Sequence, residues 1–208
     1  MPNTYLTLAS PGQAEHTIKK SRFVGHAAQV CTPDEAMAFL QQIKLAHPGA
    51  NHHAWGYSLH DGKQRYHDDG EPQGTAGLPM LDVLKKQNIV DAIVVVTRYF
   101  GGIHLGAGGL VRAYSQTAAL AVQAAGIALI ELCSVIRIGV DYNLYGRVQN
   151  AITGCMVLDT QFGQEVLLDV RVRTSETPGF IAGVIDACNG SVICEIMREE
   201  FSEIACKS

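Results

Sequence analysis

The chain has 208 residues, of which 47% are hydrophobic and 17% are charged, and its formal net charge is −4. This composition is typical of a globular protein with one large or two small domains, and it excludes an intrinsically disordered chain. The negative net charge also argues against a generally basic nucleic-acid-binding protein, and glycine is unusually frequent, at 21 residues.

The first half of the sequence mixes strand and helix patterns. An apolar pattern predicts a strand over 22–30, and Thr32 followed by Pro33 predicts the start of a helix whose apolar face is formed by Ala36, Phe39, Leu40 and Ile43. Residues 60–74 are polar and rich in glycine, which is typical of a loop. The patterns predict four further elements: a strand over 55–59, a helix from its cap Thr75 to Gln87, a strand over 89–96, and a helix over 110–125 that Gly126 ends.

The second half has a regular order of elements. The predicted elements are a strand over 131–142, a helix from its cap Asn143 to Ile152, strands over 155–161 and 164–173, a helix that Thr177 caps with Pro178 at its first position, and a strand over 191–201. This βαββαβ order is typical of a split βαβ, ferredoxin-like domain. We therefore predict an α+β protein with domains over residues 1–130 and 131–208.

Charge is divided unequally between these two predicted domains. Residues 1–130 carry ten Lys and Arg against nine Asp and Glu, whereas residues 131–208 carry six against eleven. Because phosphate backbones are attracted by positive potential, nucleic-acid contact is more plausible on the first domain, where Lys19, Lys20 and Arg22 cluster. Solvated lysines that protect a strand edge from aggregation explain the cluster equally well.

Signals for a metal, a cofactor or a membrane are weak. The six cysteines include no Cys-x-x-Cys pair, and all eight histidines lie at or before His104, so we expect neither a bound metal nor a cofactor. We predict free thiols that are mostly buried. No apolar stretch of about 18 residues is present and residues 1–10 do not resemble a secretory signal, so we expect a cytoplasmic protein that makes no membrane contact.

Three carboxylates lie within four residues at Asp68, Asp69 and Glu71. Such a group requires a positive partner nearby, which is a cation, an arginine or a substrate amine. The spacing does not fit a calcium-binding loop, although magnesium remains an alternative. The structural alternative is a turn in which Asp68 or Asp69 accepts backbone amides and Gly70 supplies a positive φ.

A second unusual segment, residues 98–109, lies between a predicted strand and a predicted helix. Its candidate binding residues are Arg98, Tyr99, Gly101, Gly102, Gly106, Gly108 and Gly109. A glycine loop before a helix offers backbone amides to an anion, and Arg112, one turn into the helix, could reach the same anion. The spacing nevertheless fits neither a phosphate-binding loop nor a dinucleotide fingerprint, and close backbone packing explains the glycines too. A buried Arg98 needs a carboxylate or a ligand oxyanion, and Asp68, Asp69 or Glu71 could supply the carboxylate.

The sequence shows no recognisable catalytic motif. His52 and His53 are adjacent in a strand pattern and should point to opposite faces, so they should not form one site, although one of them could line a cleft. No nucleophile elbow and no His-Glu-x-x-His motif is present.

These segments together resemble the IMPACT/YigZ family. The matching strings are Lys19-Lys20-Ser21-Arg22-Phe23, Asp68-Asp69-Gly70-Glu71-Pro72, Gly74-Thr75-Ala76-Gly77, Arg98-Tyr99-Phe100-Gly101-Gly102, Leu105-Gly106 and Gly108-Gly109-Leu110-Val111. The resemblance implies an N-terminal domain similar to the second domain of a small-subunit ribosomal protein, a fold that elongation factor G also contains. It implies a C-terminal ferredoxin-like domain similar to the last domain of that factor.

The resemblance also implies a role in translation. Eukaryotic relatives share only the first domain and act in translational control, competing for an activator of a kinase of the amino-acid-starvation stress response. The family has no established catalytic residue that could be carried over, and bacteria lack that kinase.

Three hypotheses follow. The first is a non-enzymatic, translation-associated binding protein that contacts RNA, the ribosome or a regulatory protein through Lys19, Lys20, Arg22, Arg98 and Arg112. The second is a metal-dependent hydrolase or transferase in which Asp68, Asp69 and Glu71 hold the metal and His67 or His104 acts as acid or base. The third gives these segments a purely structural role, with Arg98 paired to Asp68 or Asp69.

Overall fold

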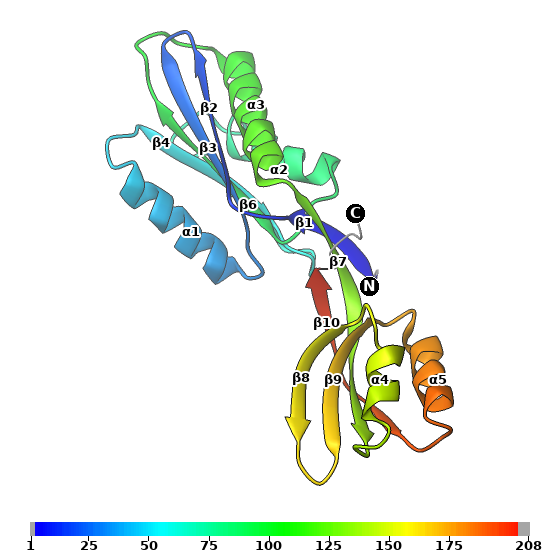
Figure 1. Ribbon diagram of the computed structural model, residues 1–208. Helices are drawn as coiled ribbons and strands as arrows, with labels where there is room; N and C mark the ends of the chain where they lie inside the picture. The colour runs from blue at the N-terminus through cyan, green and yellow to red at the C-terminus, as the bar shows by residue number, and fades with distance from the viewer. Residues whose placement is uncertain (1–2, 204–208) are drawn as a thin grey trace. The chain divides into compact units, whose positions relative to one another are not determined.

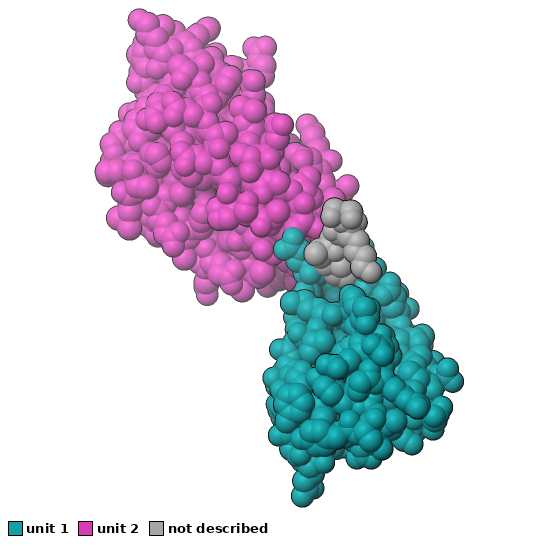
Figure 2. Space-filling view, viewed as in Figure 1, with its two compact units in different colours: residues 1–4, 130–208 teal, residues 5–129 magenta. Residues whose placement is uncertain are grey.

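The computed structural model describes residues 3–203, which form two compact units (Figure 2). The N-terminal unit comprises residues 5–129, and the C-terminal unit comprises residues 130–203 together with Asn3 and Thr4. Both units are α+β, as the sequence predicts. No helix in the described part of the chain has the length and apolarity needed to cross a membrane.

The N-terminal unit is built around an antiparallel sheet in the order β2-β3-β6-β4-β5 (Figure 1). Its elements are β1 (Thr4–Leu8), β2 (Gly12–Ile18), β3 (Ser21–Gln29), α1 (Pro33–Ala46), β4 (His52–Ser58), β5 (Gln64–His67), α2 (Gly77–Lys86), β6 (Ala92–Tyr99) and α3 (Ala107–Ala125). The sequence patterns predict most of these elements but miss β1, β2 and β5. Strand β5 is exposed at all four positions, so it lacks the apolar alternation that marks a half-buried strand.

Helices cover both faces of this sheet, with α1 on one face and α2 and α3 on the other (Figure 1). Central strand β6 therefore has no polar face. Its Val94 and Val96 pack in the cluster under α2 and α3, while Ile93 and Val95 pack in the cluster under α1. Burial on both sides explains why the sequence reads as a continuous β-branched run there rather than as an alternating pattern.

Helices α1 and α2 begin with different kinds of cap. Thr32 Oγ1 accepts a hydrogen bond from Glu35 N at 3.2 Å, which confirms the predicted cap of α1. The predicted cap of α2 is wrong, because Thr75 Oγ1 donates to Pro72 O instead. The Asp68 carboxylate, from the preceding loop, accepts the backbone amides of Gly74, Ala76 and Gly77 at 2.8–3.0 Å.

The C-terminal unit has the predicted βαββαβ order. Its elements are β7 (Ile127–Val140), α4 (Tyr145–Ala151), β8 (Met156–Phe162), β9 (Val166–Arg173), α5 (Thr177–Ala187) and β10 (Ile193–Glu203). The sheet has the strand order β1-β7-β9-β8, and β10 also pairs with β7. Both helices pack with one face of this sheet in a single apolar cluster. The predicted caps Asn143 and Thr177 are wrong, because Leu144 and Glu176 hold those positions without a side-chain hydrogen bond.

The other face of the C-terminal sheet carries cross-strand ion pairs. Arg137 and Asp169 lie opposite each other in the register of β7 and β9, and their side chains form a bidentate pair at 2.7–2.8 Å. Arg171 pairs with Glu200, and Arg173 pairs with Glu131. Carboxylates on this face therefore neutralise arginines of the same unit, and the acidic excess of this half comes from the carboxylates outside these pairs.

Substitution of Gly101 tests a close backbone approach in the N-terminal unit. A Cβ at Gly101 would lie 2.1 Å from the carbonyl carbon and oxygen of Lys20, whereas a Cβ at Gly108 would meet nothing within 4 Å. We expect Gly101→Ala to lower the free energy of unfolding by at least about 2 kcal/mol. Gly108→Ala should leave it unchanged or raise it by up to about 1 kcal/mol. Urea unfolding followed by fluorescence of the single tryptophan, Trp55, measures both; equal stability of the two variants contradicts this packing.

The half-buried His26 generates a prediction for acid stability. Its Nδ1 is buried without a hydrogen-bond partner in the described residues, and burial, aided by nearby His47, lowers the pKa of the ring to about 4 from 6.5. The unfolded chain then binds the proton more readily, so stability is full above pH 6.5 and is lost as the pH falls towards 4. We expect His26→Leu to reduce this loss in urea unfolding measured between pH 7 and pH 4. An unchanged pH dependence in the variant contradicts the expectation.

Candidate binding site

The segments singled out in the sequence meet at one end of the N-terminal sheet. Arg22, near the start of β3, pairs with Tyr99 at the end of β6, and His52, at the start of β4, pairs with Arg98. Ser21 Oγ accepts hydrogen bonds from Gly101 N at 3.2 Å and from Arg98 Nη2 at 3.3 Å. The turn before β3, the loop after β6 and the start of β4 are thus held together as one surface.

A buried ion pair lies at the centre of this surface. Arg98 Nη1 donates to Glu71 Oε1 at 2.6 Å, and the two side chains are only 6% and 4% exposed. The buried Tyr114 hydroxyl donates to the same oxygen at 2.8 Å. The guanidinium carbon lies 5.4 Å from the ring centroids of both Phe23 and Phe100. Arg98 therefore finds the carboxylate that the sequence requires, and that partner is Glu71 rather than Asp68 or Asp69.

Electrostatics keep Tyr114 a hydrogen-bond donor. Burial first, and then the adjacent negative charge of Glu71, raise the pKa of the Tyr114 hydroxyl far above its usual range. The hydroxyl therefore stays protonated and continues to donate to Glu71 at any pH at which the protein is folded.

Asp68 and Asp69 have the structural roles expected of a turn. Asp68 accepts the amides at the start of α2, and Asp69 Oδ2 accepts His53 N at 2.6 Å. Gly70 has a φ of +86°, as the turn interpretation predicts, and Asp69 has a φ of +49°. Glu71 points elsewhere, to Arg98, so the three carboxylates do not converge. Among the residues that the structure describes, no group of three or more His, Cys, Asp or Glu is placed to hold a metal ion.

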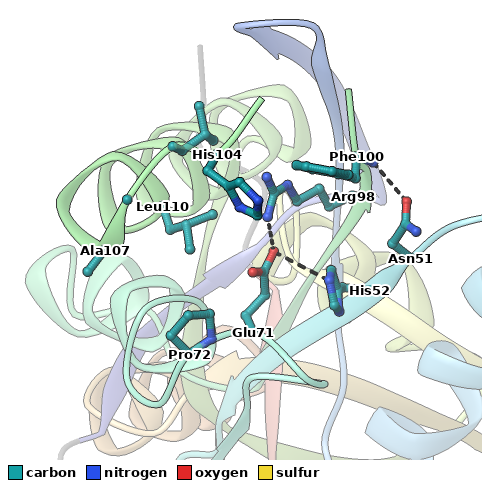
Figure 3. Close-up of a pocket in the computed structure, with 11 residues that line it drawn as sticks. Asn51, His52, Glu71, Pro72, Arg98, Phe100, His104, Ala107 and Leu110 are labelled. Atoms are coloured by element: carbon teal, nitrogen blue, oxygen red, sulfur yellow. Dashed lines mark hydrogen bonds and ion pairs between the residues drawn. The ribbon is translucent and has the colours of Figure 1, made fainter. Parts of the chain in front are cut away.

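A pocket of about 400 Å³ opens beside the ion pair (Figure 3). Glu71 and Arg98 form part of its wall, together with the loop before α3 and the first residues of that helix. The full lining is Asn51, His52, Glu71, Pro72, Arg98, Phe100, His104, Leu105, Gly106, Ala107 and Leu110. The site thus combines a buried ion pair with an open cavity. The ion pair supports the structural interpretation of Arg98 and Glu71, and a ligand-binding role for them stays a prediction.

The two adjacent histidines separate, as predicted. His53 Nδ1 lies 3.1 Å from Thr97 Oγ1, and burial lowers the pKa of its ring. His52 lines the pocket; its Nδ1 lies 2.7 Å from Asp69 O, and its Nε2 lies 4.0 Å from Glu71 Oε1. His67, a candidate acid or base, lies apart from the pocket lining and accepts Asp69 N through Nδ1.

The basic candidates lie around the pocket rather than in it. Lys19 and Lys20 occupy the exposed β2–β3 turn with φ values of +44° and +67°. Arg22 is half-exposed and forms a bidentate pair with Glu15, and its guanidinium lies 5.3 Å from the Tyr99 ring centroid. Arg112 donates to Gly108 O in its own helix and does not line the pocket, so the expectation that it shares an anion with the loop amides is not supported.

The glycines of residues 98–109 have separate roles. Gly101 packs against the backbone of Lys20, and Gly102 and Gly106 have φ values of +80° and +72°. Gly106 alone of the five predicted glycines lines the pocket. Gly108 and Gly109 lie in the first turn of α3. Tyr99 Oη lies 2.9 Å from His47 Nδ1, which directs this side chain away from the pocket.

Sequence reasoning missed two residues that organise the site. Asn51 donates its N–H to Arg98 O and accepts Phe100 N through Oδ1, so it fixes the end of β6. Tyr114 supplies the second donor to Glu71. Tyr114 had a detectable signal, because a phenol on the apolar face of a predicted helix needs a buried acceptor.

Known protein families match this chain over residues that include the segments described above. The Impact N-terminal domain family matches residues 19–122, half of the chain, and a domain of unknown function (DUF1949) matches residues 138–191. "IMPACT family member YvyE" of Bacillus subtilis is 38% identical over 194 residues, covering 91% of this chain and 89% of the relative. "IMPACT family member YigZ" of Escherichia coli is 32% identical over 195 residues, covering 91% and 96%.

A eukaryotic relative and a solved structure are also similar to this chain. "Protein IMPACT homolog" of Dictyostelium discoideum is 38% identical over 96 residues, which are 43% of this chain and 27% of the relative. A solved structure described as "Crystal structure of an hypothetical protein" has a TM-score of 0.64 and 29% identity, covering 96% of this chain and all of that chain. The matches extend through both units and include the segments that form the pocket, and the chain belongs to the IMPACT family.

Proposed function

We propose that this protein is a non-enzymatic, translation-associated binding protein whose N-terminal unit contacts ribosomal RNA. The contact surface is the end of the sheet where the β2–β3 turn, the loop after β6 and the start of α3 meet. Three cations at this end, Lys19, Lys20 and Arg112, take part in none of the ion pairs among the described residues. These available cations are the observation that carries the proposal, because free positive charge attracts a phosphate backbone.

An exposed aromatic ring adds to this surface. Phe100 is 41% exposed and precedes Gly101, whose backbone packs on the lysine turn. Exposed rings next to cations are typical of single-stranded RNA contacts, because unpaired bases stack on them. Arg22 adds less, since Glu15 neutralises it, and Arg98 supports the surface from inside rather than contacting a partner.

The C-terminal unit is less suited to this contact. Residues 131–208 carry eleven acidic against six basic residues, and the arginines on the open sheet face are paired with carboxylates. The Impact N-terminal domain family matches residues 19–122, which also supports assigning the role shared with eukaryotic relatives to the N-terminal unit. We also propose that the two units resemble domains of a ribosomal protein and of an elongation factor, and that the protein is cytoplasmic.

The non-enzymatic part of the proposal follows from how the candidate groups are used. Glu71 is held by Arg98 and Tyr114, and Asp68 and Asp69 are held by backbone amides. No serine or cysteine stands beside His52 or His104 among the residues that line the pocket. A hydrolase or transferase built on the Asp68, Asp69 and Glu71 carboxylates thus has no support in the geometry.

Ribosome retention at graded salt concentrations tests the proposal. We expect purified ribosomes to retain the wild-type protein at low salt. In the triple variant Lys19→Asn, Lys20→Asn, Arg112→Gln, the slope of the logarithm of the binding constant against the logarithm of the salt concentration should become shallower by about 2–3. Asparagine is chosen at the two turn positions because it tolerates positive φ. The affinity of this variant should fall at least tenfold.

The matched control removes three exposed cations elsewhere, Lys85→Gln, Lys86→Gln and Arg147→Gln, and should bind as the wild type does. Equal weakening by both triple variants contradicts the assigned surface, and absence of retention at low salt contradicts ribosome contact altogether. Retention that survives nuclease digestion of the RNA and depends little on salt would instead assign the contact to a protein.

A further inference from the structure

Two hydrogen-bond acceptors on the pocket wall, His52 Nε2 and Glu71 Oε2, accept no hydrogen bond from the described residues. His52 Nδ1 lies 2.7 Å from the Asp69 carbonyl oxygen, which can only accept, so Nδ1 carries the proton of the neutral ring. Nε2 is then an acceptor, and it lies 4.0 Å from Glu71 Oε1, too far for a hydrogen bond. Glu71 Oε2 accepts no hydrogen bond from the described residues. Figure 3 shows both side chains converging on the cavity.

These two open acceptors suit a nitrogen that carries several hydrogens. A nitrogen between the His52 ring and the Glu71 carboxylate would donate one N–H to Nε2 and another to Oε2, because Oε1 already accepts from Arg98 and Tyr114. A primary ammonium group has three donors and no acceptor, so it can satisfy both groups without adding an unpaired lone pair. The carboxylate is 4% exposed, which makes its hydrogen bond to a cation stronger than one at the surface.

Local charge also favours a cation over an anion. Three carboxylates, Asp68, Asp69 and Glu71, lie in this loop, and Arg98 is the one guanidinium that pairs with any of them in the described residues. Arg98 Nη1 and Nη2 are engaged by Glu71 and Ser21, and its Nε, which has no partner among the described residues, is buried, so the guanidinium offers little to an anionic ligand. An anion in the pocket would also face the Glu71 carboxylate.

The remaining wall of the pocket is apolar. Phe100, Leu105 and Leu110 line it, and its volume of about 400 Å³ is within the range of small-ligand sites. A water molecule could bridge the two acceptors but would leave this apolar wall without a partner. An aliphatic stem attached to the ammonium group would cover it.

We propose that the pocket binds a primary ammonium group on a short aliphatic stem. The ammonium lies between His52 Nε2 and the Glu71 carboxylate, and the stem packs on Phe100, Leu105 and Leu110. A free alkylamine and the lysine side chain of a polypeptide share this chemistry. The inference stands independently of the ribosome contact proposed above, since it concerns the pocket and not the surrounding cations.

Titration of histidine-labelled protein at pH 8 by nuclear magnetic resonance tests the proposal. We expect n-butylammonium to shift the His52 Nε2 resonance and to saturate at millimolar concentration. n-Butanol, with the same stem but no charge, and butyrate, with the opposite charge, should give at least tenfold weaker effects. If Nα-acetyl-lysine methylamide shifts the resonance as strongly as butylammonium does, the ligand is a lysine side chain. If its effect is weaker, the ligand is a small free amine.

Variants make the assignment specific. Affinity for butylammonium, measured by saturation transfer to the ligand, should fall at least tenfold in Glu71→Gln and in His52→Phe. His53→Phe changes the neighbouring ring on the other face and should bind as the wild type does. If Glu71→Gln does not fold by circular dichroism, His52→Phe decides the result, because it leaves the ion pair intact. An unmoved His52 resonance, an equal response to butanol, or full affinity in His52→Phe would overturn the proposal.

Discussion

The buried pair of Arg98 and Glu71 connects most of the segments that form the candidate site. Arg98 lies next to the last residue of the central strand β6, and Glu71 belongs to the loop after β5. Tyr114 on α3 donates to Glu71, and Ser21 at the start of β3 accepts from Arg98, whose Nε is buried without a partner among the described residues. Taking two charges out of water is costly, and removing one partner of such a pair typically costs about 3–5 kcal/mol. The pair therefore fixes where the loop, the strand and the helix meet, and the pocket exists because they meet there.

Phe23 and Phe100 allow the guanidinium to be buried at that position. The Arg98 guanidinium carbon lies 5.4 Å from each ring centroid, so both aromatic faces replace water around a charge that Glu71 neutralises. Phe23 is fully buried, whereas Phe100 is 41% exposed. One ring thus packs the pair against the core, and the other covers it on the side that faces solvent. This arrangement explains how a single ion pair can be structural and also line an open pocket.

How far the sequence predicts this arrangement depends on the range of each interaction. Local signals sufficed for the Thr32 cap, the positive φ of Gly70, and the need of Arg98 for a carboxylate, because each depends on nearby residues or on a single buried charge. Longer-range choices were not predictable. Asp68 replaces Thr75 as the side chain that caps α2, from eight and nine residues away, and Arg112 donates to Gly108 O in its own helix. Strand β5 lacks any apolar signal because it is an exposed edge strand.

Charge pairing separates the roles of the two units. In the C-terminal unit the open sheet face places arginines opposite carboxylates, as in Arg137 with Asp169, and such pairs leave little field beyond the surface. In the N-terminal unit, which is nearly neutral in total, the buried Arg98 is matched by Glu71, and Lys19, Lys20 and Arg112 keep their charge exposed. Net charge therefore describes each unit only in part, because it does not show which charges are paired. The unpaired cations at the end of the N-terminal sheet lie around the pocket that opens beside the ion pair.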